Sequence, residues 1–282
     1  MTGNNEALKI GCQTFTWEML GERWTGGPDD LLRSIAAGGY RGIEITDTMI
    51  GRYAARPDEF GAALEEHGLE LAAFACATHS GFTQREAIDE DLDTTARWIE
   101  FMGRFPGAPV SLGSATLVSD GPREAAFEVA AEIYNRAAAL GMAAGVPVAI
   151  HPSSHHRTLL FDRDDYDRLF ALLDPDTVGW VPDTGHMLRG GLDLLDTLQR
   201  YRSLIRYVHL KDVDERGDWV MLGAGTCDVS AVIELAAGAP RFNGWIVVEE
   251  ESGMAAADPA DAVRKNRETL SRMGYRATGD PE

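Results

Sequence analysis

Histidine and carboxylate residues follow four successive apolar runs in the second half of the chain. The runs VAIHPSSHH, VPDTGH, YVHLKD and VVEEE place His151, Asp183, His209 and Glu249 at or just after the ends of predicted strands. Each residue alone also fits a structural role, such as a hydrogen-bonded histidine or a glutamate that starts a solvated loop. Imidazole nitrogens and carboxylate oxygens bind divalent ions at about 2 Å. Because four such ends occur in succession, the pattern predicts a divalent-metal site.

Other polar residues near these ends could transfer protons. We interpret His151 as either a ligand or a base, His156 as a nearby acid–base group, and His155 as an exposed polar residue. Histidine suits proton transfer because its ordinary pKa of about 6.5 lies near neutral pH. Lys211 could polarise an oxygen or assist a leaving group, or it could be a surface lysine that follows a strand.

Three residues in the first half of the chain are candidates for contact with a substrate. Glu44 ends a predicted strand and could contact substrate hydroxyls or form an ion pair at the rim. His79 and Trp17 follow two other predicted strands and could line a pocket. Aromatic faces pack well on the C–H surfaces of sugars, although a tryptophan more often belongs to the core.

A divalent metal beside a base favours one type of chemistry. The ion stabilises the enediolate that forms when the carbon next to a chelated ketone loses its proton. If a leaving group is bonded at the β position, the enediolate expels it, which is dehydration or lyase cleavage. If no group leaves, reprotonation gives an epimer or an aldose–ketose isomer. The residues alone leave both courses open.

Eight short apolar runs alternate with longer amphipathic patterns and must position these residues. The predicted strands are 8–15, 42–46, 69–76, 109–114, 146–150, 178–182, 205–210 and 244–250. The predicted helices are 28–39, 57–68, 91–105, 122–145, 163–174, 192–202, 229–239 and 259–274. Continuous apolar runs are typical of parallel strands covered on both faces. The alternation predicts an α/β fold.

The predicted architecture is a single (β/α)8 TIM barrel. It forms one domain over residues 1–282, with the barrel at about 8–275 and a short flexible C-terminal tail. An open doubly wound sheet shares the alternation but needs a glycine-rich turn after its first strand, and TFTWEMLGERW has none. In a barrel the active site lies at the carboxyl ends of the strands, where the candidate ligands fall.

The composition excludes several partners. Among 282 residues, 45 acidic and 26 basic side chains give a formal charge of −19. Nucleic acids and anionic membrane surfaces attract lysine and arginine, so we expect neither as a partner. Three cysteines without a CxxC pair favour reduced thiols. Without an evident signal peptide or a long apolar run, we expect a cytoplasmic protein.

The segments VPDTGH, YVHLKD, LGAGTCD and GWIVVEEE resemble the sugar phosphate isomerase/epimerase superfamily of xylose isomerase-like barrels. The pattern is closest to its inosose dehydratases and is also similar to lyases of 3-keto sugars. The resemblance implies that Asp183, His209 and Glu249 bind a divalent metal, with Mn²⁺ first and Co²⁺, Mg²⁺ or Zn²⁺ as alternatives. It also implies that His186 forms hydrogen bonds with substrate oxygens.

The fifth strand departs from the pattern of many of these enzymes. His151 stands where many epimerases of the superfamily carry a glutamate that is both ligand and base, whereas the inosose dehydratases favour His-Pro there. We therefore expect dehydration or β-elimination of a keto-sugar or keto-cyclitol, of the inosose dehydratase or 3-keto-glycoside lyase type. The alternatives are a ketose 3-epimerase or hydroxypyruvate isomerase type of reaction and a non-catalytic barrel subunit. A homo-oligomer or a complex with a small β-subunit is the expected assembly.

Overall fold

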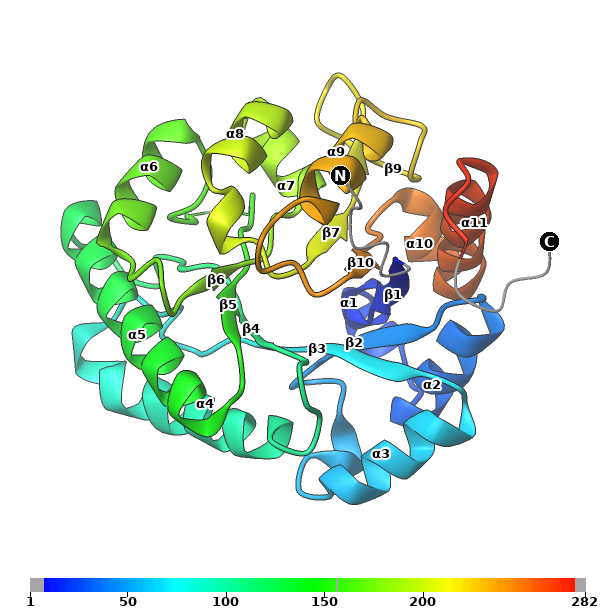
Figure 1. Cartoon of the computed structure of the whole chain (residues 1–282), viewed down its shortest axis with the longest axis horizontal. Helices are drawn as coiled ribbons and strands as arrows, with labels where there is room; N and C mark the ends of the chain where they lie inside the picture. The colour runs from blue at the N-terminus through cyan, green and yellow to red at the C-terminus, as the bar shows by residue number, and fades with distance from the viewer. Residues whose placement is uncertain (1–7, 156, 277–282) are drawn as a thin grey trace.

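Eight parallel strands form the centre of the computed structural model, which describes residues 8–155 and 157–276 (Figure 1). They are β1 (Lys9–Gln13), β2 (Gly42–Thr46), β3 (Glu70–Cys76), β4 (Val110–Leu112), β5 (Val148–Ile150), β6 (Gly179–Trp180), β7 (Val208–Leu210) and β10 (Trp245–Val248). Their order is β6-β5-β4-β3-β2-β1-β10-β7. Parallel bridges from Trp180 to Ile205 and from Asp183 to His209 join the two ends of this sheet. The predicted (β/α)8 barrel is confirmed.

Helices surround the strands and cover their outer faces (Figure 1). They are α2 (Pro28–Ala37), α3 (Pro57–Glu66), α4 (Ile88–Met102), α5 (Arg123–Ala144), α6 (Arg163–Leu172), α8 (Leu194–Arg200), α9 (Val229–Ala237) and α11 (Pro259–Arg272). Each predicted helix is found, with ends that differ by at most three residues. Proline in the first turn begins α2, α3 and α11, and an aspartate side chain caps α6, α8 and α9.

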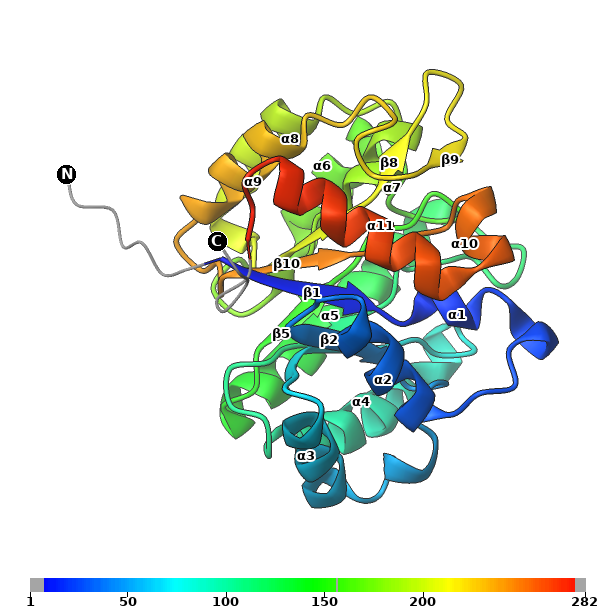
Figure 2. The same cartoon turned by 90° about the vertical axis from the view of Figure 1, so that its right-hand side faces the viewer.

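Short elements gather at the carboxyl end of the barrel. They are α1 (Phe15–Glu18), α7 (Thr184–Arg189), α10 (Gly253–Ala257) and a hairpin of β8 (Asp212–Val213) with β9 (Trp219–Val220). In Figure 2, β1 points toward α1, and α10 and the hairpin lie at the same end. Single turns of 3-10 helix, η1 (Gly21–Arg23), η2 (Gly51–Tyr53), η3 (Arg85–Ala87) and η4 (Arg202–Leu204), complete the connections.

The strands are buried on both faces, as their continuous apolar runs predict. Every residue of β2 is buried, including the polar Glu44 and Thr46. A buried carboxylate requires hydrogen bonds or charged partners, so Glu44 must have one inside the barrel. Between residues 8 and 276, the described helices include none that is both long and apolar enough to cross a membrane.

Candidate metal centre and active site

Four side chains from four strand ends converge on one point at the rim of the barrel. Ligand-type atoms of His151, Asp183, His209 and Glu249 all lie within 4.8 Å of one another. His209 Nδ1 is 2.9 Å from both His151 Nε2 and Glu249 Oε2, and Asp183 Oδ2 is 3.7 Å from both histidines. Ligands that surround one ion at about 2.1 Å lie about 3.0–3.4 Å from each other. The cluster is therefore close to the spacing that a divalent ion requires.

Asp183 carries the clearest sign that this cluster fits a cation. Its Oδ1 accepts a hydrogen bond from the backbone N–H of His186 at 2.8 Å and so caps α7. Its Oδ2 is buried, faces the cluster and has no hydrogen-bond partner within the described residues. A buried carboxylate oxygen whose nearest partners are two imidazoles 3.7 Å away lacks a hydrogen bond, and a divalent ion would satisfy it. Two imidazoles and two carboxylates suit Mn²⁺, Co²⁺ or Zn²⁺.

Glu44 fixes the orientation of His209. The Nε2 of His209 and the Oε2 of Glu44 are 2.7 Å apart, so the other ring nitrogen, Nδ1, faces the cluster. A carboxylate behind a ligating histidine holds the ring and increases its basicity. Burial lowers the pKa of His209, but Glu44 and the carboxylates of the cluster outweigh this effect and raise the pKa overall. The structure shows the ion pair of Glu44 through Oε2, and contact of Glu44 with substrate hydroxyls stays a prediction.

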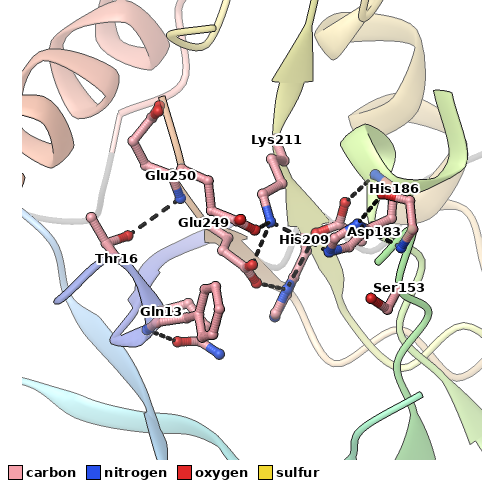
Figure 3. Close-up of polar contacts among 12 residues, drawn as sticks. Gln13, Thr16, Ser153, Asp183, His186, His209, Lys211, Glu249 and Glu250 are labelled. Atoms are coloured by element: carbon pink, nitrogen blue, oxygen red, sulfur yellow. Dashed lines mark hydrogen bonds and ion pairs between the residues drawn. The ribbon is translucent and has the colours of Figure 1, made fainter. Parts of the chain in front are cut away.

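Lys211 is buried behind Glu249 and is not a surface lysine (Figure 3). Its Nζ lies 2.5 Å from Glu249 Oε1, also contacts Glu251, and lies 4.5 Å from the centroid of the Trp219 ring. Burial lowers its pKa, but Glu249 and Glu251 outweigh this effect and hold the pKa above its usual range. Lys211 therefore carries a positive charge that positions Glu249.

A cavity of about 320 Å³ opens beside the cluster. His151, His186, His209, Glu249 and Glu44 all line it. A volume of this size takes a six-membered ring with its hydroxyls, which is smaller than the drug-sized ligands of most pockets. Lys211 is absent from the described lining, which supports a positioning role over direct contact with substrate.

His186 contributes a neutral imidazole to the wall of this cavity. The backbone N–H of Ser154 donates to its Nδ1 at 3.0 Å, and its Nε2 lies 3.4 Å from Lys211 Nζ. Burial and the neighbouring Lys211 hold the pKa of His186 well below its usual range. A neutral histidine can form a hydrogen bond with a substrate oxygen.

The structure places two predicted pocket walls outside the described lining of the cavity. Trp17 is 1% exposed, belongs to the core and has its ring centroid 6.4 Å from that of Trp24, because the short helix α1 buries it. His79 is exposed, and neither residue is among the described residues that line the cavity. His156, the predicted acid–base group, lies outside the described residues.

Three residues that line the cavity were not predicted from the sequence to line it. Glu18 follows β1 in α1, Asp47 follows β2 directly, and His155 follows β5. His155 is half exposed and has its Nε2 3.8 Å from Glu251 Oε2. The rule that identified the metal-type residues, a polar side chain directly after a strand, would have found Asp47 if it had also been applied to the second strand.

The LGAGTCD segment folds around a single carboxylate. Asp212, which begins β8, accepts hydrogen bonds of 2.9–3.0 Å from the backbone N–H groups of Gly223, Gly225 and Cys227. A Cβ on Gly225 would lie 2.3 Å from Asp212 Oδ1 and 2.2 Å from the Val213 carbonyl oxygen, so this position requires glycine. The glycines thus anchor the hairpin whose Trp219 covers Lys211 and His186.

Comparisons with known proteins agree with this geometry. The chain is 28% identical to the inosose dehydratase of Geobacillus kaustophilus, over 94% of both chains. It is 31% identical to the inosose dehydratase of Geobacillus thermodenitrificans, over 93% of this chain and 96% of the relative. The crystal structure of the IOLI protein with a bound zinc atom superposes with a TM-score of 0.77, at 16% identity, over 95% of this chain and 99% of that one. Residues 32–273 match the xylose isomerase-like TIM barrel family, and the chain belongs to that family.

Proposed function

We propose that this chain is a divalent-metal-dependent dehydratase of a keto-cyclitol, with 2-keto-myo-inositol as the first candidate substrate. One observation supports this proposal most strongly: Asp183 Oδ2 is buried, has no hydrogen-bond partner among the described residues, and lies in a cluster of four ligand-type side chains beside a cavity that fits a ring substrate. The similarity to two inosose dehydratases over nearly the whole chain supports the substrate class.

In this proposal His151, Asp183, His209 and Glu249 hold the ion, with Mn²⁺ as the first candidate. A bound divalent ion supplies positive charge to the carbonyl and neighbouring hydroxyl oxygens of the substrate. His186 forms a hydrogen bond with one of these oxygens and orients the ring. These contacts favour loss of the proton from the carbon beside the carbonyl, because the enediolate that forms carries its charge on the same oxygens.

A second histidine moves the protons. We assign this role to His155, because it lines the cavity, remains accessible to water and has a carboxylate of Glu251 3.8 Å away. His155 takes the proton from the carbon beside the carbonyl, and the electron pair of that C–H bond forms a C=C bond. The same side chain then returns the proton to the β hydroxyl, which leaves as water. Substitution of His155 by glutamine is expected to lower kcat by about 100-fold, the ordinary contribution of a general base.

The test is to identify the product. Manganese-loaded enzyme is incubated with 2-keto-myo-inositol, and the products are followed by NMR and mass spectrometry. A product lighter by one water, with a new C=C bond conjugated to the carbonyl, supports the proposal. Deuterium incorporation from D₂O without loss of water would instead identify an epimerase or isomerase, and no conversion of this ketone would reject the substrate.

A further inference from the structure

Two carboxylates line the active-site cavity on the side away from His151 and Asp183. Glu18 follows β1 and Asp47 follows β2, whereas His151 and Asp183 follow β5 and β6. Four places in the strand order separate β1 from β5 and β2 from β6, which is half-way around an eight-stranded barrel. A ring substrate whose carbonyl lies on the His151 and Asp183 side of the cluster would therefore extend across the cavity toward Glu18 and Asp47.

We propose that Glu18 and Asp47 form a subsite for the hydroxyl groups that do not react, and that this subsite selects uncharged polyhydroxylated rings over phosphorylated sugars. The inference rests on the proposed function, because it assumes that the carbonyl of the substrate lies at the metal-type cluster. The proposed subsite would recognise the hydroxyl groups of the substrate that lie beyond the reach of the metal-type cluster.

Both carboxylates are held in place before a ligand binds. The hydroxyl of Thr46 donates to Glu18 Oε2 at 2.6 Å and lies 3.0 Å from the hydroxyl of Thr48. Backbone N–H groups of Thr48 and Ala77 donate to the Asp47 carboxylate. Burial and the nearby Glu18 raise the pKa of Asp47 to about 6, so Asp47 is mainly ionised at neutral pH and accepts hydrogen bonds from hydroxyls.

The wall of the cavity also carries serine hydroxyls. Ser111 and Ser114 line it together with Glu18 and Asp47, and the hydroxyl of the buried Tyr207 hydrogen-bonds with Ser111 and Glu44. A hydroxyl can both donate and accept, so a polyol satisfies carboxylates and serine alike.

The charge of the lining argues against an anionic substrate. Glu18, Glu44, Asp47 and Glu249 line the cavity, whereas none of its described lining residues is a lysine or an arginine. Phosphate groups are usually bound by arginine, lysine or backbone N–H groups. A phosphate directed toward Glu18 and Asp47 would meet like charges in a partly buried site, which disfavours binding.

The test measures both binding and catalysis with manganese-loaded full-length protein. Glu18→Gln and Asp47→Asn are compared with Glu22→Gln, an exposed neighbour on the same segment. In Glu18→Gln and Asp47→Asn we expect the KM for 2-keto-myo-inositol and the Kd for myo-inositol to rise about tenfold to hundredfold, because each variant loses a hydrogen bond to a charged group. In Glu22→Gln we expect both values to remain unchanged. Wild-type protein is expected to bind inositol monophosphate much more weakly than inositol.

The outcomes separate this inference from the proposed function. Unchanged KM and unchanged Kd in both variants, with retained folding and manganese content, would overturn the subsite. Equal or tighter binding of inositol monophosphate by the wild type would overturn the selection against phosphate. If wild-type protein fails to dehydrate the ketone but the Kd for inositol still rises in the variants, the subsite stands and the proposed function is wrong.

Discussion

Asp183 combines two functions in one carboxylate. One oxygen caps α7, and the other faces the cluster without a hydrogen-bond partner among the described residues. Asparagine can still cap a helix, but it has no negative charge for a cation. The substitution Asp183→Asn therefore separates the structural role of this residue from the metal-binding role.

We predict that Asp183→Asn and His209→Ala each lose bound metal and reduce turnover by at least 100-fold, because each removes one of four ligands. Metal content is measured by elemental analysis after dialysis, together with kcat. Asp193→Asn is the matched control, since Asp193 caps α8 in the same way but lies away from the cluster. A full equivalent of Mn²⁺ or Co²⁺ in either ligand variant would refute the assignment.

Asp47 gives a prediction about stability and pH. Burial and Glu18 raise its pKa in the folded protein to about 6, from an ordinary value of 3.8. The folded state therefore retains the proton more strongly than the unfolded state, and the free energy of unfolding falls as pH rises from about 4 to 6. The full shift corresponds to about 3 kcal/mol, and partial exposure of the side chain reduces this to about 1–2 kcal/mol.

Asp47→Asn removes this penalty and is expected to raise the free energy of unfolding by about 1–2 kcal/mol at pH 7.5, and by about half as much at pH 5. Urea denaturation at the two pH values measures the difference. The exposed Asp93→Asn serves as the control, for which we expect no pH-dependent difference. A variant that is less stable than wild type at pH 7.5 would contradict the prediction.

At the residue scale, candidate site residues at strand ends could be predicted from the sequence, and those that the loops place in the cavity could not. His151, Asp183, His209 and Glu249 could be identified because each lies at or next to the end of an apolar run. Glu18 could not, since it is the last residue of the short helix α1 that follows β1, and only the fold turns it toward the cavity. Trp17 was misplaced for the same reason, because sequence position alone does not tell which side of α1 faces the core.

At the scale of elements, the hairpin of β8 and β9 depends on the loop that follows it. The carboxylate of Asp212 binds three backbone N–H groups of that loop, and Trp219 of β9 covers Lys211 and His186. Lys211 in turn contacts Glu249. The loop is thereby linked to the cluster through a chain of direct contacts.

We predict that Gly225→Ala displaces this loop, because the new Cβ would lie 2.2 Å from the Val213 carbonyl oxygen. The expected loss of stability is about 1–3 kcal/mol, the usual effect of overpacking, with a fall in kcat/KM. Thermal unfolding and tryptophan fluorescence measure the change. Gly121→Ala is the control, since a Cβ there meets nothing within 4 Å. Wild-type stability and activity in Gly225→Ala would show that the loop does not support the site.

Long elements were predictable from the sequence and short ones were not. Strong periodicity and terminal proline or glycine located helices such as α2 and α11 to within a few residues. The six residues of α7 and the two-residue strands β8 and β9 are too short for a periodic signal. They form because a capping aspartate and the Asp212 carboxylate hold their backbones.

At the scale of the whole molecule, some of the many acidic residues lie together in the candidate active site. The formal charge of −19 first argued only against anionic partners. The structure places four carboxylates on the wall of one cavity, where they would attract a cation and disfavour an anionic substrate. The expected homo-oligomer or complex with a small β-subunit stays a prediction, as does cytoplasmic localisation.

The central claim is that dehydration of a keto-cyclitol depends on a divalent ion held by these four side chains. The most direct measurement is turnover of 2-keto-myo-inositol by protein stripped with a chelator and then titrated with Mn²⁺ or Co²⁺. We predict no formation of the dehydrated product in stripped protein, and recovery that rises linearly and reaches a plateau at one equivalent of ion per chain. Undiminished dehydration by metal-free protein would contradict the account.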